Sequence, residues 1–443
     1  MVSASLAAWM NGQLVGTWTV DRGAHRFTYH RSWLDSPKRR ALSLSLPITP
    51  ALEIRGAAVA NYFDNLLPDN EKIRERLGRR FKTRSTDAFA LLEAIGRDCV
   101  GAVQLLPEGA EPAGWDRIHS EPLSEAQVAG LLRAVPSDSV LGQEADDDLF
   151  RISLAGAQEK TALLFRDGAW HQPHGATPTT HILKLPLGLV GGSRRVDLGD
   201  SVANEWLCAQ ILYQLGLAVA RTEMWRFEDQ QALVVTRFDR AWQKHSDGHP
   251  DGRDWIARLP QEDLCQALGY PPNRKYEKDG GPGIADCMRL LAGGDPGDRG
   301  LFALAQLTFW LMAATDGHAK NFSIFLQPGD AYVATPLYDV LSIFPYIGDA
   351  PNQFRWRRAE LAFALRAKNV HYDLHGIHAR HWHALALQHG GAPVWQRMLG
   401  HVDGVEAALQ RVENDLPADF PRRTWLAISR GMREQVKRFR GGP

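Results

Sequence analysis

The sequence of 443 residues lacks an excess of charge of either sign, because 51 lysines and arginines balance 51 aspartates and glutamates. No global field therefore draws the chain to nucleic acid or to an anionic membrane, and only a local basic patch could do so. The four cysteines, Cys99, Cys208, Cys265 and Cys287, are far apart and match no C-x-x-C metal motif. Buried free thiols in a reducing compartment are the simplest interpretation.

The sequence also lacks a hydrophobic run long enough to cross a membrane. The longest run, 301–314, is interrupted by Gln306 and falls short of the roughly 20 residues that a bilayer requires. The first residues, MVSASLAAWMNGQ, contain no basic region, and Asn11 breaks their apolar stretch, so we predict no signal peptide. We therefore expect a cytoplasmic protein.

The composition, with 44% apolar and 23% charged residues, is typical of a globular protein. Its length suggests about three domains. Residues 6–30 alternate apolar and polar around Asn11-Gly12, which predicts a strand meander. Residues 58–81 have a helical pattern that is interrupted near Pro68, and residues 87–96 predict a short helix that stops at Gly96.

The pattern changes along the rest of the chain. Residues 106–117 resemble a linker, and Ser124 with Gln127 fits a capping box that opens a helix. Strands with tight turns dominate from about residue 150 to Arg240, with one amphipathic helix over 200–217. Mainly helical patterns follow. A β-rich half and then a helical half suggest two lobes with a cleft between them.

The stretch TDGHAKNFS, residues 315–323, follows the apolar run and brings an acid, an imidazole, an ammonium and a carboxamide together. Asp316 and Asn321 have the spacing of the protein-kinase catalytic loop, H-R-D-x-x-x-x-N. There the Asp accepts or orients the proton of the attacking hydroxyl, and the Asn oxygen reaches a magnesium ion that bridges the phosphates. Alone the spacing is weak, since about one such pair is expected by chance.

Asp339, in PLYDVLS, lies eighteen residues after Asn321 and follows a hairpin-like segment. Magnesium needs further hard oxygen ligands, and Asp339 could take the role that the D-F-G Asp has in kinases. The YDV context excludes a standard eukaryotic kinase but keeps the arrangement. Taken alone, Asp339 fits equally well as the N-cap of a following helix.

Two features upstream fit phosphate groups. The small residues of the turn SLAGAQEKT (153–161) let backbone N–H groups approach a phosphate, although the turn is not a Walker A loop and an ordinary hairpin turn is the alternative. Lys184 stands alone in the apolar strand HILKLP, where a lysine either reaches for solvent or pairs the phosphates with a helix glutamate. Glu205, on the next helix, is the natural partner. Glycine loop, lysine, glutamate, Asp, Asn and second Asp follow one another in the order found in kinases.

At these residues the sequence closely resembles the HipA family, the serine/threonine-kinase toxins of HipBA toxin–antitoxin modules. The resemblance covers nearly the whole length. It is carried by the runs LSLSLP, NYFDNLLPDN, IGRDCVGAV, FRISLAGAQEKTALL, TPTTHILKLP, RLPQEDLCQALG, YEKDGGPGI, ATDGHAKNFSIF and PLYDVLSIFP.

The resemblance implies an α+β, bilobal, protein-kinase-like fold with an extra N-terminal α/β module. The implied domains are an accessory module (1–112), a β-rich kinase-like N-lobe (113–240) and an all-α C-lobe (241–443). The resemblance further implies a bacterial cytoplasmic toxin that uses ATP and Mg2+ to phosphorylate a protein serine, on glutamyl-tRNA synthetase in the best-known members. Growth arrest and persistence follow. The implied partner is a HipB-like helix-turn-helix antitoxin that represses the shared operon.

The family's site residues carry over by motif. Asp316 is the catalytic base, Asn321 and Asp339 hold magnesium, Glu205 is the candidate partner of Lys184, and Ser153 is the autophosphorylation site. The residues implied in ATP binding are Ala155, Gly156, Ala157, Gln158, Glu159, Lys160, Lys184, Thr236, Arg237, Phe238, His318, Ala319, Lys320, Asn321, Tyr338 and Asp339. Residues 236–238 would present backbone groups to adenine.

One region departs from the family. The stretch RAKNVHYDLHGIHARHW (366–382), comparable to a basic DNA-contacting segment, has few fixed positive charges, so a solvated loop is the expectation and DNA is reached mainly through the antitoxin. Two other functions stay open. A small-molecule phosphotransferase would use the same three polar residues, whereas a non-catalytic co-repressor would be expected to have lost one of them.

Overall fold

The computed structural model describes residues 4–136, 158–190, 195–244 and 254–441 of the chain. The chain divides into two compact units. The first holds Met1–Leu185, Trp225–Asn273 and Ser323–Tyr332, and the second holds Pro186–Met224, Arg274–Phe322 and Val333–Pro443. Each unit is therefore assembled from segments far apart in sequence, and the three consecutive domains expected above stay a prediction.

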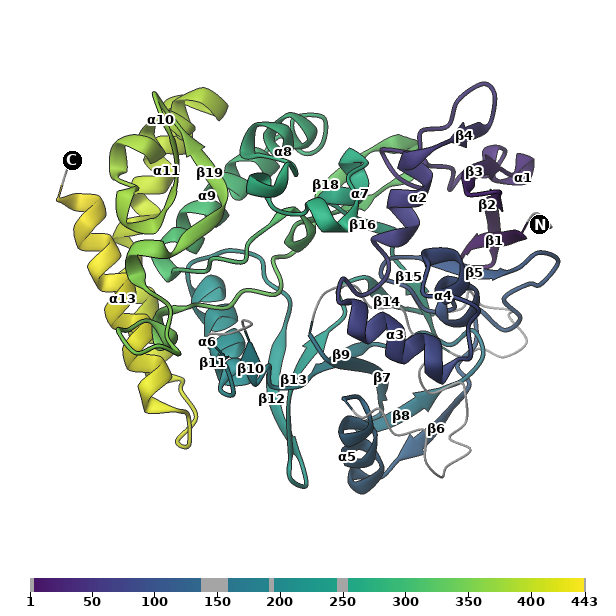
Figure 1. The fold of residues 1–443 in the computed structure, drawn as a ribbon, viewed down its shortest axis with the longest axis horizontal. Helices are drawn as coiled ribbons and strands as arrows, with labels where there is room; N and C mark the ends of the chain where they lie inside the picture. The colour runs from purple at the N-terminus through teal and green to yellow at the C-terminus, as the bar shows by residue number, and fades with distance from the viewer. Residues whose placement is uncertain (1–3, 137–157, 191–194, 245–253, 442–443) are drawn as a thin grey trace. The chain divides into compact units, whose positions relative to one another are not determined.

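The first unit begins with an antiparallel sheet in the order β4-β3-β2-β1-β5 (Figure 1). Its strands are β1 (Ala4–Met10), β2 (Gln13–Asp21), β3 (Ala24–Tyr29), β4 (Glu53–Arg55) and β5 (Val103–Pro107). Asn11 and Gly12 join β1 to β2 with φ angles of 44° and 75°, and two positive φ values are what a two-residue NG hairpin requires. The predicted meander is confirmed.

Helices accompany this sheet, and aromatic side chains fill the core between them. The helices are α1 (Arg31–Leu34), α2 (Ala57–Asp64), α3 (Glu71–Arg80) and α4 (Ala88–Ile95). Trp18 of β2 stacks on Phe63 of α2 with 4.0 Å between ring centroids, and it meets Phe89 of α4 at 4.9 Å. The expected break near Pro68 falls between α2 and α3, and α4 ends at Gly96, as predicted.

A second sheet of the first unit has the order β12-β13-β9-β7-β8-β6. Its strands are β6 (Ser120–Leu123), β7 (Lys160–Arg166), β8 (Ala169–Pro173), β9 (His181–Lys184), β12 (Thr222–Phe227) and β13 (Gln230–Thr236). Helix α5 (Glu125–Ala134) opens with the predicted capping box of Ser124 and Gln127. Asp167 and Gly168, with φ of 53° and 80°, make the tight turn between β7 and β8.

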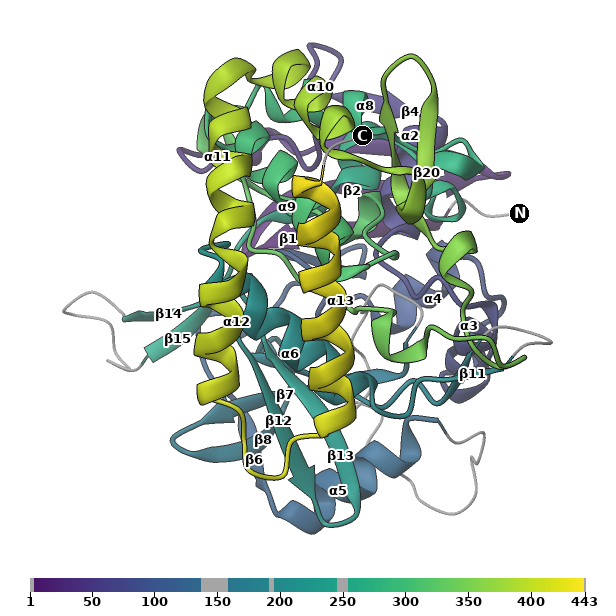
Figure 2. The ribbon, with the colours of Figure 1, turned by 90° about the vertical axis from the view of Figure 1, so that its left-hand side faces the viewer.

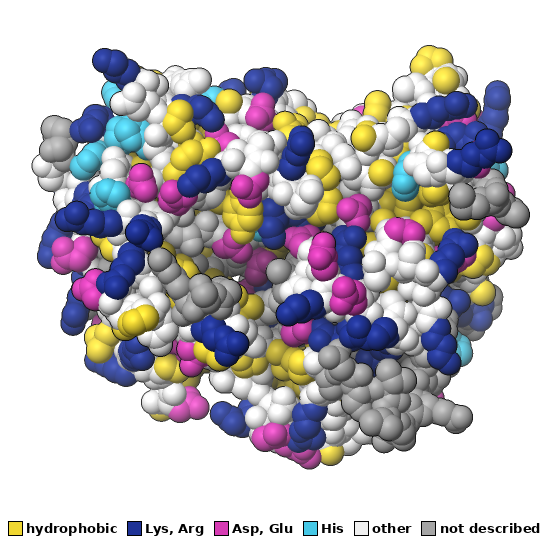
Figure 3. Space-filling model, viewed as in Figure 1, with side chains coloured by type: hydrophobic (Ala, Val, Ile, Leu, Met, Phe, Trp, Pro, Cys, Tyr) yellow, Lys and Arg dark blue, Asp and Glu magenta, His cyan; other side chains and the backbone are white. Residues whose placement is uncertain are grey.

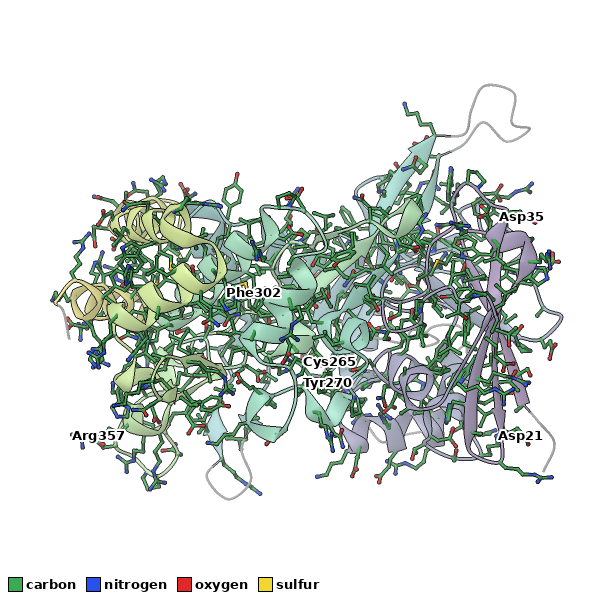
Figure 4. All side chains as sticks on the ribbon, turned by 90° about the horizontal axis from the view of Figure 1, so that it is seen from above. Asp21, Asp35, Cys265, Tyr270, Phe302 and Arg357 are labelled. Atoms are coloured by element: carbon green, nitrogen blue, oxygen red, sulfur yellow. The ribbon has the colours of Figure 1, made fainter. Side chains whose placement is uncertain are left out.

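Smaller elements complete the first unit. They are the hairpin β14 (Arg240–Lys244) with β15 (Asp254–Arg258), the sheet β16 (Gln261–Asp263), β17 (Ser323–Leu326) and β18 (Tyr332–Ala334), and helix α7 (Leu264–Leu268). Helix α7 ends at Gly269 in the left-handed conformation, and the Tyr270 amide turns back to donate to the Cys265 carbonyl at 2.8 Å (Figure 4).

The second unit is mainly helical. It contains the short strands β10 (Leu189–Val190) and β11 (Val196–Asp197) and the helices α6 (Ser201–Gln214), α8 (Ile284–Leu291), α9 (Asp298–Met312), α10 (Ala379–His389), α11 (Gly391–Asp403), α12 (Val405–Asn414) and α13 (Arg422–Arg440). Helices α12 and α13 pack beside α6, as Figure 2 shows. Helix α9 is buried over most of its length, and its Trp310 packs on Trp382 of α10 and Phe439 of α13.

The expected all-α character of residues 241–443 needs correction at several places. Strands β15, β16, β17 and β18 lie within this range, and a further hairpin follows them. Residues 360–373 form the hairpin β19 (Glu360–Arg366) with β20 (Val370–Asp373). The composition of the run ELAFALR is typical of a helix. Its residues from Leu361 to Leu365 are all buried, and a short continuous apolar run of this kind fits a core strand as well as a buried helix. Sequence periodicity could not separate the two.

Two expectations about composition can be compared with the fold. Cys99, Cys208, Cys265 and Cys287 are all buried and free, as predicted. Within the part of the chain that the structure describes, no helix is both long and apolar enough to cross a membrane.

Candidate active site

The candidate catalytic loop begins where the buried helix α9 ends. Ala313 adopts a left-handed conformation (φ 50°), and the Ala314 amide bonds back to the Phe309 carbonyl at 2.8 Å, which stops the helix abruptly. Gly317 follows, and a β-carbon at this position would lie 2.3 Å from the Phe309 ring. Only glycine fits there, so α9 fixes the path of the loop.

The loop then brings Asp316 and Asn321 together. The His318 amide donates to the Asp316 carbonyl at 2.8 Å, and one turn of 3-10 helix covers Ala319–Asn321. The Asn321 side chain closes the loop, because its Nδ2 donates to the Asp316 carbonyl at 2.8 Å. That bond turns the side-chain oxygen Oδ1 away from the carbonyl, which suits an oxygen ligand for a cation. The Asp316 carboxylate is largely exposed (64%) and faces solvent.

Asp339 lies in a strained turn rather than at the start of a helix. Its φ is 60°, a left-handed value that is uncommon for residues other than glycine and is several-fold enriched in Asp and Asn. The next helical element is a single turn that begins at Phe344, so the N-cap interpretation of Asp339 is wrong. The Tyr338 hydroxyl donates to the Lys320 carbonyl at 2.9 Å, which ties the residue before Asp339 to the residue before Asn321.

Residues that sequence reasoning missed hold this segment in place. Asn204 of α6 is fully buried and makes two hydrogen bonds with the backbone of Ser342, from Nδ2 to the carbonyl at 2.8 Å and from the amide to Oδ1 at 3.0 Å. The Ser342 hydroxyl donates to the Met312 carbonyl, and the Ile343 amide donates to Ala313. The Asp339 segment is thus bound to both α6 and the end of α9.

Tyr276, which sequence reasoning also missed, is hydrogen-bonded to the candidate base Asp316. Its hydroxyl donates to Asp316 Oδ1, and its ring stands edge-on to the buried His318 ring with 4.9 Å between centroids. The next residue, Glu277, holds the segment of Tyr276 in place, because its carboxylate accepts a hydrogen bond from the Ala364 amide of β19 at 2.8 Å. A hydrogen bond to a carboxylate is stronger than one between neutral groups, so Tyr276 orients Asp316.

The first unit carries the candidate phosphate residues. Lys160 of β7 and Lys184 of β9 are direct cross-strand partners, so their side chains project from the same face of the sheet. Two ammonium groups on one face of a sheet suit an anion such as phosphate. Gln158 supports the edge of this site by donating from Nε2 to the Leu185 carbonyl at 2.6 Å, and Glu159 pairs with Arg76.

Several predicted residues are not tested by these contacts. Ser153 and the small residues 155–157 lie outside the described residues. Lys184 belongs to the first unit and Glu205, buried in α6, to the second, so their pairing stays a prediction.

The predicted adenine-facing segment, Thr236 to Phe238, lies at the end of β13. The Arg237 amide donates to the Thr180 carbonyl at 2.9 Å, and the Arg237 side chain points into the interior with 4% of the residue exposed. There it meets Asp98 at 3.3 Å and Asp239 at 2.8 Å. Its guanidinium is therefore a structural element of the first unit, and any contact of this segment with a ligand falls to its backbone groups.

The stretch 366–382 is not the solvated loop that was expected. It forms the end of β19, strand β20 and the start of α10. His371 and His381 stack with 4.1 Å between centroids, and Figure 3 shows histidine side chains gathered on this part of the surface. Burial, followed by the charges of His371 and Arg380, lowers the pKa of His381 to about 4. The histidines add little positive charge at neutral pH, which weakens the case for a phosphate contact further.

A family model described as the HipA-like C-terminal domain matches residues 152–417, and one described as the HipA N-terminal domain matches residues 6–106. A Sinorhizobium fredii protein named "Putative kinase Y4mE" is 34% identical over 420 residues, which are 93% of this chain and 92% of that protein. The serine/threonine-protein kinase toxin HipA of Shewanella oneidensis is 26% identical over 357 residues, 75% of this chain and 74% of that one.

A solved structure resembles the fold. It is the Shewanella oneidensis MR-1 toxin–antitoxin complex of HipA, HipB and operator DNA, with a TM-score of 0.78 and 23% identity, covering 99% of this chain and 98% of that one. The likeness confirms the expected fold class, an α+β kinase-like fold with an additional N-terminal module.

Proposed function

This chain belongs to the HipA family, and from that premise we propose that it is an ATP- and magnesium-dependent serine/threonine-protein kinase, the toxin of a type II toxin–antitoxin module. The observation that carries the proposal is the loop after α9, which carries a carboxylate and a carboxamide and is closed by a hydrogen bond from the Asn321 side chain to the main-chain carbonyl of Asp316. Kinases use these two groups, at this spacing, on the attacking hydroxyl and on the metal.

The roles follow from the chemistry of each group. Asp316, steadied by Tyr276, accepts or orients the proton of the substrate hydroxyl. The oxygens of Asn321 and Asp339 would hold magnesium, which when bound neutralises charge on the phosphates. Lys160 and Lys184 bind phosphate oxygens from their shared face of the sheet.

The remaining predicted residues complete the proposed nucleotide site and its control. His318, Ala319, Lys320 and Tyr338 line the nucleotide, residues 236–238 offer backbone groups to adenine, and Glu205 pairs with Lys184. Ser153, which precedes Lys160 in the sequence, receives phosphate from the enzyme itself. A phosphoserine there adds roughly −2 charge next to the site for the ATP phosphates and so inactivates the kinase.

The proposed target and partner come from the family. We propose that the chain phosphorylates an aminoacyl-tRNA synthetase, glutamyl-tRNA synthetase being the first candidate, so that translation stops and the cell enters persistence. A HipB-like antitoxin binds the chain and represses the shared operon, as the neighbouring structure of HipA with HipB and operator DNA suggests. The low positive charge of residues 366–382 favours contact with DNA through the antitoxin.

The direct test is phosphoryl transfer by the purified chain with labelled ATP and magnesium. Asp316→Gln should lower labelling of Ser153 by about 100-fold or more, because positioning and proton acceptance are lost together. Asp403→Gln is the matched control, since Asp403 lies on the exposed face of α11 and pairs with Arg440 at the surface. Labelling that persists in Asp316→Gln would refute the assignment of the base.

Growth and phosphoproteome measurements separate the alternatives. Expression of the wild type should arrest growth, and Asp316→Gln should not. Arrest by both variants would favour the co-repressor, which needs no catalysis. Phosphate found on a small molecule and on no protein would favour the small-molecule phosphotransferase. A phosphoproteome of cells that express either variant identifies the protein target.

A further inference from the structure

A cavity of about 480 Å³ in the second unit opens beside the candidate base. Asp316, Thr315 and Tyr276 form part of its wall, so the carboxylate that handles the substrate hydroxyl faces the same space. The volume lies within the range of roughly 300–1,000 Å³ that is typical of ligand pockets. None of the residues proposed above to hold the nucleotide or the metal lines this cavity.

Apolar side chains form part of the wall of this cavity. They come from the start of β19, from the segment before it and from two other places in the unit: Val196, Ile343, Phe354, Ala359, Leu361 and Ala362. Phe354 is the most exposed of them at 36%, whereas the others are buried. Contact with an apolar group removes this apolar surface from water, which makes the free energy of binding more favourable.

Two of the cations that line the cavity are paired within the protein. Lys278 pairs with Glu360 at 2.6 Å, and Arg355 pairs with Asp349. Asp279 and Arg358 also line the cavity and give its wall a polar part that can contact a peptide backbone. An apolar side chain that is presented by a polar backbone fits it better than a sugar or a nucleotide does.

We propose that this cavity is the acceptor-side subsite of the kinase and binds an apolar side chain close in sequence to the serine or threonine that is phosphorylated. A cavity of this volume is about 10 Å across, and an extended chain advances about 3.3–3.6 Å per residue, so the apolar residue lies within about two positions of the acceptor. The inference rests on the proposed function and adds to it a substrate class, protein segments with an apolar residue beside the acceptor hydroxyl.

The test uses the purified full-length chain, ATP and a library of serine-centred peptides with randomised flanking positions. Leu, Ile, Met, Val or Phe should be enriched at one position within two residues of the serine. In a matched pair of peptides, replacing that residue by Gly should lower kcat/KM by about tenfold or more. The peptide FRISLAG, residues 150–156 of this chain, and its Ile152→Gly and Leu154→Gly forms are convenient first probes.

Two variants connect the preference to the cavity. Ala362→Phe should fill it and bring the ratio of kcat/KM between the apolar and Gly peptides close to one. Phe354→Ala removes a partly exposed wall, which the fold tolerates better, and should reduce the same ratio several-fold. Leu387→Ala, at an exposed site (53%) on α10 away from the cavity, should leave the ratio as in the wild type.

The outcomes distinguish this inference from the proposed function. Peptide phosphorylation without any apolar preference would overturn the subsite, and so would a preference that survives in both Ala362→Phe and Phe354→Ala. Absence of phosphate on every peptide and on the chain itself, with ATP binding intact, would instead overturn the kinase assignment.

Discussion

Asp98 lies at the centre of a buried ion cluster that joins the IGRDCVGAV segment to the end of β13. Its Oδ1 is 2.9 Å from Arg240 and 3.1 Å from Arg258, and its Oδ2 is 3.3 Å from Arg237. Asp239 is the second acid, so three arginines and two aspartates leave a net charge of +1. We predict that Asp98→Asn is strongly destabilising, since it raises that charge to +2 and replaces one acceptor oxygen by an N–H donor that faces arginines.

The magnitude follows from burial. The Asp98 side chain is 8% exposed, and removal of one partner from a buried ion pair typically costs about 3–5 kcal/mol of the free energy of unfolding. Asp229→Asn is the control, because Asp229 is also bound to an arginine, Arg133, but at the surface with 65% exposure. Water screens an exposed pair of this kind, so its loss should change the free energy of unfolding very little.

The assay is urea denaturation of both variants at several pH values. Burial alone would raise the pKa of the Asp98 carboxyl, but Arg240, Arg237 and Arg258 outweigh it and hold the pKa well below its ordinary value. The stabilisation is therefore complete above the unfolded-state pKa of about 3.8 and is lost as the pH falls below it. Asp98→Asn should lack this loss at acid pH. Equal costs for Asp98→Asn and Asp229→Asn at pH 7 would refute the reasoning.

Three further predictions concern single residues. Tyr276→Phe removes the hydroxyl that donates to Asp316 and should lower kcat about tenfold with the KM for ATP nearly unchanged; an unaltered kcat in steady-state assays would contradict a positioning role. Asn204→Ala leaves the Ser342 amide and carbonyl without their buried partner. It should lower the free energy of unfolding, measured with denaturant, by about 2–4 kcal/mol and should also reduce activity. A loss below about 1 kcal/mol would argue against this anchoring role. Burial raises the pKa of Glu262 to about 8, so the free energy of unfolding of the wild type should fall as the pH rises from about 4.5 to 8. Glu262→Gln cannot ionise and should not show this fall in the same assay. Parallel pH profiles of the two proteins would count against a buried neutral acid at this position.

Much of the local structure was predictable because it depends on neighbours in sequence. The Asn11-Gly12 turn, the capping box that Ser124 opens and the helix stop at Gly96 are each decided within about four residues. Asp316 and Asn321 could also be proposed from the sequence, since one loop carries both at the spacing found in kinases and further kinase-like residues surround them in the expected order. Their roles stay a prediction.

The rest of the candidate site could not be found in this way. Tyr276 meets Asp316 across 40 positions, Asn204 meets Ser342 across 138, and Arg237 meets Asp98 across 139. No sequence pattern predicts such a pair, because its two residues come into contact only when elements that are remote in the sequence pack together. Arg237 shows the consequence, since the motif predicted a role only for its backbone, and the ion cluster that its side chain joins became visible in the fold.

The sequence by itself determined the family, the turns and helix ends, and the identity of the residues suited to phosphoryl transfer, because these depend on residue type and short spacing. The tertiary structure decided which groups orient them: the hydroxyl of Tyr276 on Asp316, the α6 anchor of the Asp339 segment and the apolar cavity beside the base. The physical reason is that hydrogen bonds and apolar contacts act only over a few ångströms, and distance along the chain says little about distance in space.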